Sequence, residues 1–98
     1  MIRHVVLFRW VPEATSAQVD ALSEALAELP GQIPQIRAYH FGPDLGAAAG
    51  NWDYAVTADF DSRDDHAVYR DHPAHVALIE EHIVPIRADR AAVQFDLA

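Results

Sequence analysis

Several kinds of residue are absent or scarce in this chain of 98 residues. It contains no cysteine, so neither disulfides nor thiol chemistry is expected. It has 7 basic and 15 acidic residues, and the resulting net charge of -8 repels nucleic acid and anionic membranes. No apolar run is long enough for a signal peptide or a membrane span. We therefore expect a cytoplasmic protein that has neither nucleic acid nor a membrane as a partner.

The length fits a single domain that covers residues 1–98. At this size, roughly two-thirds of the surface of the unfolded chain can be buried, so a hydrophobic core is feasible without disulfides. Apart from a Gly/Ala-rich loop over residues 42–50, the sequence shows no linker, internal repeat or low-complexity segment.

Four segments alternate between apolar and polar residues, as β-strands do. In the first of them, His4 is the only polar member of an otherwise apolar face. His4 is therefore either a hydrogen-bonded core residue or part of a pocket lining. The predicted strands are Ile2 to Val11, Ile36 to Gly42, Trp52 to Phe60 and Arg90 to Leu97.

Two helical regions separate these strands. Thr15 and Gln18 form a capping box, and the apolar spacing that follows predicts an amphipathic helix that ends at Pro30-Gly31. The second region starts with Asp61 or Ser62 as its N-cap. Proline cannot continue an α-helix without losing a hydrogen bond, so a second helical piece should begin at Pro73 and end at Pro85.

The predicted order is therefore β-α-β-β-α-β. This order indicates an α+β, ferredoxin-like fold: a four-stranded antiparallel sheet with both helices on one side. The other face of the sheet would carry Val5 and Leu7, together with Tyr39 and Phe41. These side chains are too apolar to leave in water, so a second copy of the chain is expected to cover them in a homodimer.

Titratable side chains are concentrated in the segment from Asp65 to His75. This segment contains three of the six histidines. Such groups at a helix junction are candidates for chemistry, because histidine changes charge near neutral pH. We expect His66 to lie at the surface. Without a functional role, His72 would serve only as an N-cap and Tyr69 as a core aromatic residue with its hydroxyl at the surface.

The opening strand Ile2 to Trp10, the residues Pro34 and Gly42, and above all the motif Tyr69-x-x-His72-Pro73-Ala74-His75-Val76 resemble the stress-responsive A/B barrel (Dabb) domain family. The resemblance covers essentially the whole chain. It implies a small dimeric α+β barrel in which the sheets of two ferredoxin-like protomers pack face to face. The family includes proteins with no known reaction and plant polyketide cyclases, which close a ring by intramolecular aldol condensation.

The resemblance to the cyclases implies that Tyr69 and His75 are a catalytic pair. His75 in the first turn of a helix should be held in its neutral, basic form, and Tyr69 could donate a hydrogen bond to an oxyanion. Such chemistry needs no cofactor. Its ligand would be a small apolar or polyketide molecule, and its substrate a poly-β-ketone-like or aromatic small molecule. The residues expected to line the substrate cavity are His4, Val6, Phe8, Leu26, Val56, Ala58, His72 and Leu78.

Other interpretations of the sequence stay open. His72, His75 and His82 could supply nitrogen ligands to a metal, although the proline interrupts their geometry. Relatives also imply a cation held by the backbone carbonyls of Pro30, Ile33 and Ile36. A third interpretation is a dimeric ligand-binding or stress-protective protein without turnover.

Two positions depart from the cyclase pattern. Tyr54 stands where the cyclases carry a second strand histidine, and Ile79 stands where they have a small residue. We therefore expect a cavity shaped for a substrate other than that of the plant enzymes.

Overall fold

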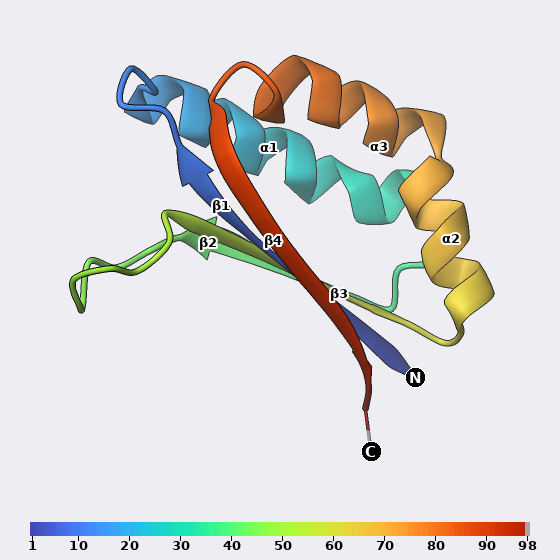
Figure 1. The fold of residues 1–98 in the computed structure, drawn as a ribbon. Coiled ribbons are helices and arrows are strands. Elements are labelled where there is room, and N and C mark those ends of the chain that lie inside the picture. Colours follow the sequence, from blue (N-terminus) through green and yellow to red (C-terminus); the bar gives the residue numbers. More distant parts are fainter. Residues whose placement is uncertain (98) are drawn as a thin grey trace.

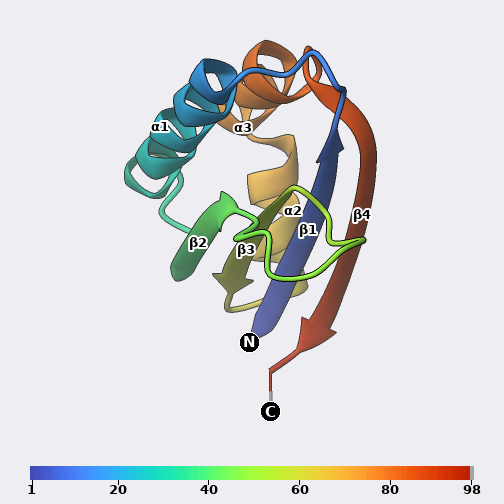
Figure 2. The same cartoon turned by 90° about the vertical axis from the view of Figure 1, so that its left-hand side faces the viewer.

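The computed structural model describes residues 1–97 and confirms the predicted ferredoxin-like α+β fold (Figure 1). One antiparallel sheet has the strand order β2-β3-β1-β4, and all the helices lie on the same face of it (Figure 2). The elements are β1 (Ile2–Trp10), α1 (Ser16–Gln32), β2 (Ala38–Pro43), β3 (Tyr54–Phe60), α2 (Arg63–Asp71), α3 (Pro73–Leu78), η1 (Ile79–Ile83) and β4 (Arg87–Asp96).

Helix α1 begins as predicted but ends later. The Thr15 hydroxyl accepts a hydrogen bond from the Gln18 backbone N–H at 3.2 Å, and the Gln18 side chain accepts from the Thr15 backbone N–H at 2.9 Å. The predicted end at Pro30-Gly31 comes too early, because the helix continues through both residues to Gln32. The Ile33 N–H still donates to the Leu29 carbonyl at 2.8 Å, and the Ile33 side chain is fully buried. Burial of that last turn outweighs the hydrogen bond that the proline cannot form.

The second helical region has three parts. Ser62 is the N-cap of α2, and its hydroxyl accepts from the Asp65 N–H at 3.1 Å. The chain breaks at His72, and α3 starts at Pro73 as predicted. Helix α3 then runs directly into η1, a wider π-helical turn, before the chain turns into β4.

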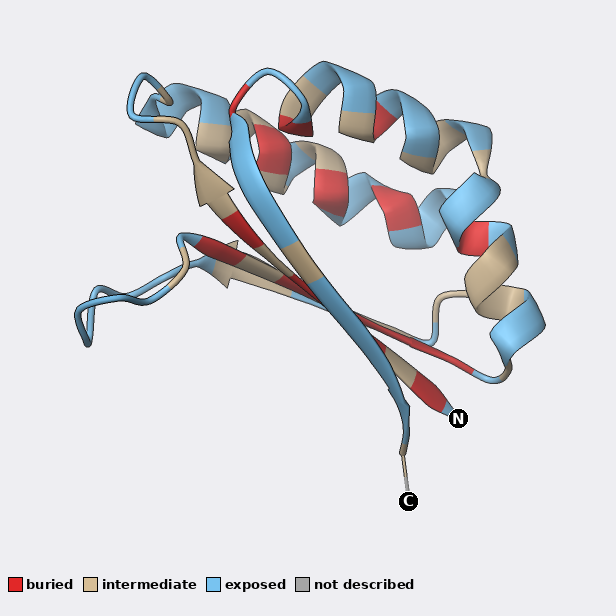
Figure 3. Cartoon of the chain, in the orientation of Figure 1, coloured by how far each residue is buried: buried red, intermediate tan, exposed pale blue. Residues whose placement is uncertain are grey.

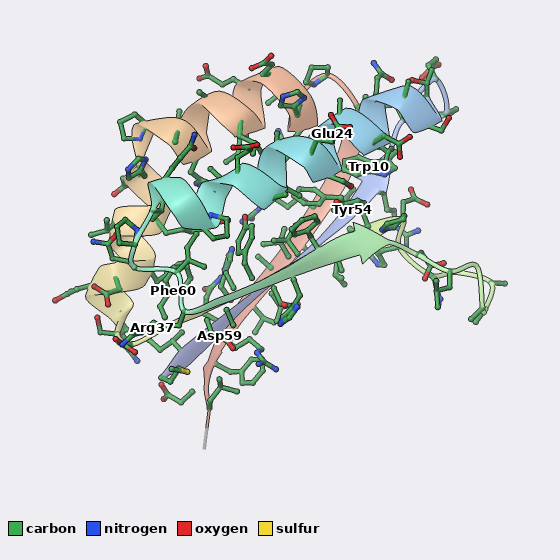
Figure 4. All side chains as sticks on the ribbon, turned by 180° about the vertical axis from the view of Figure 1, so that it is seen from behind. Trp10, Glu24, Arg37, Tyr54, Asp59 and Phe60 are labelled. Carbon is green, nitrogen blue, oxygen red and sulfur yellow. The ribbon has the colours of Figure 1, made fainter. Side chains whose placement is uncertain are left out.

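The core lies between the sheet and the helices. Tyr54 and Phe60 of β3 project from the sheet beneath the helices (Figure 4). Tyr39 and Phe41 project from this same face, because they pair in register with Ala58 and with Val56. The prediction that Tyr39 and Phe41 lie on the opposite face is therefore wrong: alternation predicts that they share a face but does not say which one.

The opposite face of the sheet, which no helix covers, carries Val5 and Leu7 of β1. In β4, Val93 pairs with Val5 and Phe95 pairs with Arg3, and their side chains are 55% and 46% exposed. Figure 3 shows the exposure of β4 along most of its length. In the part of the chain described, no helix is long and apolar enough to cross a membrane.

Three strands begin at other residues than predicted, and the ends of β1, β2 and β4 differ from the predictions by one residue. Strand β2 begins at Ala38, two residues after the predicted start, and β3 begins at Tyr54 instead of Trp52. Strand β4 begins three residues earlier than predicted, at Arg87. Because of this extension, Arg87 pairs with Trp10 of β1 and joins Arg90 as a second arginine of β4 beside the helices.

Candidate functional site

A cavity of about 70 Å³ lies between the sheet and the helices. Strands β1, β2, β3 and β4 contribute to its walls, as do α1, α2, α3 and η1. The residues around it are His4, Val6, Phe8, Leu26, Tyr39, Val56, Tyr69, His75, Leu78, Ile79, Ile83, Arg87 and Arg90.

The structure brings most of the sequence-predicted residues to this one cavity. Tyr69 and His75 both line it, and so do six of the eight residues expected to contact a substrate: His4, Val6, Phe8, Leu26, Val56 and Leu78. The other two lie elsewhere. Ala58 is packed in the core with 1% of its surface exposed, and His72 caps α3, where its Nδ1 accepts from the Ala74 N–H at 3.1 Å.

His75 lies at the start of α3 with its ring half-buried against Tyr69, at 4.1 Å between ring centroids. Its Nδ1 is 3.1 Å from the carbonyl oxygen of Arg70. A carbonyl can only accept, so Nδ1 carries the proton and Nε2 keeps a free lone pair. Burial is the main reason that the pKa of His75 lies below its ordinary value. The imidazole is therefore neutral and presents one basic nitrogen.

The acceptor for His75 exists because the helix breaks at His72. In a continuous α-helix, the Arg70 carbonyl would accept from the Ala74 N–H. Here the Ala74 N–H donates to the His72 side chain instead. Pro73 has no N–H, and the break leaves the Arg70 carbonyl available to the His75 ring. One motif thus supplies both the helix junction and the orientation of the histidine.

Tyr69 is 3% exposed, and its hydroxyl lies 2.8 Å from that of Tyr39. The suggestion that its hydroxyl reaches the surface is therefore wrong. Burial raises the pKa of Tyr69 to about 12 and also raises the pKa of Tyr39. Both phenols are neutral at physiological pH and can donate hydrogen bonds within the cavity.

His4 combines the two roles that the sequence left open. It is 5% exposed, its Nδ1 accepts from the Gln94 side-chain amide at 2.8 Å, and its ring also lines the cavity. Burial, reinforced by the nearby His66, lowers its pKa to about 4. The surface position predicted for His66 is wrong, because its half-buried ring lies 4.7 Å from that of His4 and 5.5 Å from that of Phe60.

The cavity lies in a chain whose sequence matches a known domain. Residues 2–97 match the stress-responsive A/B barrel domain, Dabb. The chain belongs to the Dabb family. Both features that indicated the family in the sequence contribute to the cavity. The first strand forms part of its sheet wall, and the Tyr69 to Val76 motif forms part of its helical wall.

Among relatives of this Dabb protein, a stress-response A/B barrel domain-containing protein of Arabidopsis thaliana is 27% identical over 96 residues. The match covers 97% of this chain but only 36% of the plant protein. A dimeric ferredoxin-like protein of unknown function from Thermobifida fusca, known from a crystal structure, is 51% identical in sequence with a TM-score of 0.91. The match covers 98% of this chain and 90% of the Thermobifida fusca chain.

A hydroxynitrile lyase from Passiflora edulis has the same fold. Its TM-score is 0.85 at 20% identity, and the match covers 99% of this Dabb chain and 93% of the plant chain. At that identity the likeness establishes the fold alone.

No group of three or more His, Cys, Asp or Glu side chains within residues 1–97 is arranged to hold a metal ion. His72 uses its Nδ1 to cap α3, and His82 lies 3.8 Å from Glu81. Of the backbone carbonyls suggested for a cation, that of Ile33 accepts from the Ile36 N–H at 3.1 Å. The cation stays a hypothesis.

Four cavity residues were not predicted from the sequence: Tyr39, Ile83, Arg87 and Arg90. Ile79, where the sequence departs from the cyclase pattern, also lines the cavity. Tyr39 was assigned to the wrong face of the sheet, and Arg87 was left outside the last strand. Ile83 reaches the cavity through the π-helical turn, which helical spacing of 3.6 residues does not anticipate. Arg90 alternates with Ala91 and Val93 in β4, which shows only that it lies on the opposite face from them; its pairing with Phe8 places it on the helix side.

Proposed function

We propose that this Dabb protein is a cofactor-independent enzyme in which His75 is the general base and Tyr69 the oxyanion donor. The observation that carries the proposal is the bond between His75 Nδ1 and the Arg70 carbonyl. It fixes the tautomer with a free Nε2 in a ring that contacts a buried, neutral phenol. A base and a hydrogen-bond donor thus share one largely apolar cavity.

The reaction that suits these groups begins at a carbon acid. Nε2 of His75 takes a proton from a carbon flanked by carbonyls, which a base of this strength can do. The Tyr69 O–H donates to the enolate oxygen that forms, and Tyr39 can donate to Tyr69 in turn. The enolate carbon then attacks a third carbonyl further along the same molecule and forms a carbon–carbon bond. The imidazolium of His75 returns its proton to the new alkoxide, so the aldol cyclisation is balanced without a cofactor.

The size of the cavity favours a compact substrate. One water molecule occupies roughly 10–15 Å³ of such space, so the cavity holds a few waters or a small carbonyl compound. The side chain of Ile79 fills part of the wall. Tyr54, whose hydroxyl is 2.7 Å from that of Ser23, does not line the cavity. A long poly-β-ketone fits this space less well than a short tricarbonyl compound.

The same proposal includes a homodimer formed through the face of the sheet opposite the helices. Val5, Leu7, Val93 and Phe95 leave an apolar surface there. The relative from Thermobifida fusca is described as dimeric, and so is a structural neighbour from Bacteroides fragilis. A second copy would cover this surface while leaving the helices outside.

Deuterium exchange tests the base directly. In D₂O, the protein should accelerate the exchange of the proton between the carbonyls of a compact 1,3-diketone. Proton NMR measures the rate at which the signal of that proton disappears. We expect His75→Ala to lower the exchange rate by about 10²–10⁴-fold. We expect Tyr69→Phe, which keeps the ring but removes the donor, to lower it by about 10²–10³-fold.

The matched control is His40→Ala, since His40 is exposed on the opposite face of the sheet. It should exchange like the unmodified protein. An unchanged rate in His75→Ala would remove the histidine from the mechanism. Tight diketone binding with no exchange at all would instead favour the alternative function, a dimeric ligand-binding or stress-protective protein without turnover.

A further inference from the structure

Two arginines of β4 lie at the rim of the cavity. Arg90 pairs in register with Phe8, and Arg87 pairs with Trp10 after a shift of register. Partners on neighbouring strands project from the same face of a sheet, so both arginines lie on the side of the helices. Both line the cavity although both are exposed, so the cavity reaches the surface beside them.

Neither guanidinium group has a hydrogen-bond or ion-pair partner within residues 1–97, where the arginine ion pairs belong to Arg3, Arg37 and Arg70. The nearest acidic residue in the sequence is Asp89. Its carboxylate accepts from the backbone N–H of Arg90 at 2.8 Å, and the residue pairs in register with Arg9 on the opposite face. In a chain with 15 acidic residues, the guanidinium groups at the cavity rim are thus left without a carboxylate.

The charge of Arg90 also acts inside the cavity. Burial is the main reason that the pKa values of His4 and His75 are low, and the positive charge of Arg90 lowers both further. A cation that disfavours positive charge on these rings also favours an anion at the same place. Largely apolar walls strengthen that attraction, because they replace water as the surrounding medium.

Building on the proposed function, we infer that Arg90, assisted by Arg87, binds a carboxylate of the substrate and selects compact oxo-carboxylic acids over neutral ketones. The planar fork of a guanidinium group matches a carboxylate with two parallel hydrogen bonds. An acid bound in this way has its apolar part and its carbonyl in the cavity with Tyr69 and His75. Its carboxylate stays at the rim, where it keeps part of its hydration.

Paired probes test the inference. Levulinate carries a ketone and a carboxylate, and methyl levulinate is its uncharged ester. NMR titration should show that the unmodified protein binds levulinate at least about tenfold more tightly than the ester, as expected for charge-assisted hydrogen bonds. Arg90→Gln should lose about tenfold in affinity for the acid and none for the ester. Arg90→Lys, which keeps the charge but not the fork, should fall between.

The matched control is Arg63→Gln. Arg63 is an exposed arginine in the first turn of α2 that takes no part in the cavity. This variant should keep the preference for the acid. Equal affinity of the unmodified protein for acid and ester, no binding of the acid, or an equal loss for both probes in Arg90→Gln would each overturn the inference.

The binding measurement separates this inference from the role of His75. In His75→Ala, the preference for the acid should persist, because the rim arginines are untouched. If the diketone exchange assay fails while Arg90-dependent binding of levulinate remains, the base assignment fails and the carboxylate site stands. If exchange depends on His75 but Arg90→Gln leaves acid binding unchanged, the carboxylate site fails and the base assignment stands.

Discussion

The two faces of the sheet carry apolar groups in different surroundings. The helix-facing side surrounds a small cavity with buried polar groups, and each of these has a defined partner: Tyr69 with Tyr39, His4 with Gln94, and His75 with a backbone carbonyl. The opposite face has exposed Val93 and Phe95 beside a bidentate ion pair between Arg3 and Asp59.

This difference separates the proposed chemistry from the proposed assembly. On the helix side, a few polar atoms in apolar surroundings decide what the protein can do, and their effects are large because little water screens them. On the opposite face, the proposed dimer depends on the total apolar area that it buries, and each single contact contributes less energy. Substitutions of the same kind on the two faces should therefore give unequal results.

The largest expected difference comes from two phenylalanines. Phe60→Ala, on the helix side and fully buried, should lower the free energy of unfolding by about 3–5 kcal/mol, because it leaves a cavity in the core. Phe95→Ala, on the opposite face with 46% of its surface exposed in the single chain, should cost well under half of that at protein concentrations below the dimer dissociation constant. Urea unfolding followed by tryptophan fluorescence measures both. Equal losses would mean that the two faces are equally important for folding.

A smaller effect should come from His4. Its folded pKa of about 4 lies below the ordinary value of 6.5, so the unfolded chain binds the proton first. The contribution of His4 to the free energy of unfolding is therefore fully present above pH 6.5 and is lost as the pH falls toward 4. The loss due to His4 should reach at most about 3 kcal/mol.

Urea unfolding at several pH values, compared between the unmodified protein and His4→Gln, isolates this contribution. The stability difference between the two proteins should shrink as the pH is lowered. His40→Gln, on the opposite face, should follow the profile of the unmodified protein. A constant difference between the protein and His4→Gln at every pH would contradict the assignment.

The smallest expected effect concerns assembly. Val93→Asp introduces a charge on the face proposed for the dimer and should raise the dimer dissociation constant by about tenfold or more, because that charge must be desolvated. The control is Val76→Asp on α3, where the valine is 40% exposed on the helical layer. Sedimentation equilibrium measures both constants. If Val76→Asp dissociates the protein and Val93→Asp does not, the proposed interface is on the wrong face.

Much of the fold could be predicted from local signals. The capping box at Thr15, the N-cap at Ser62 and the helix start at Pro73 each depend on a few neighbouring residues, and the structure confirms all three. The extension of α1 past Pro30 could not be predicted in this way. It depends on the burial of Ile33 against the core, which is a tertiary effect.

The candidate site was predictable in its centre but not at its edges. The motif that carries Tyr69 and His75 is contiguous in the sequence, whereas Tyr39 reaches Tyr69 only through the pairing of β2 with β3. Arg90 similarly depends on the pairing of β4 with β1. Local alternation shows which residues share a face, and only the register between strands shows what that face meets.

The partner of His75 Nδ1 has one further consequence. Many catalytic histidines are oriented by a carboxylate, which a single substitution can delete. Here the acceptor is a main-chain oxygen, and every amino acid placed at position 70 would still provide it. The orientation of the His75 ring, the proposed base, is therefore insensitive to substitution at position 70. It is sensitive to substitution at the helix break two and three residues further on, at His72 and Pro73.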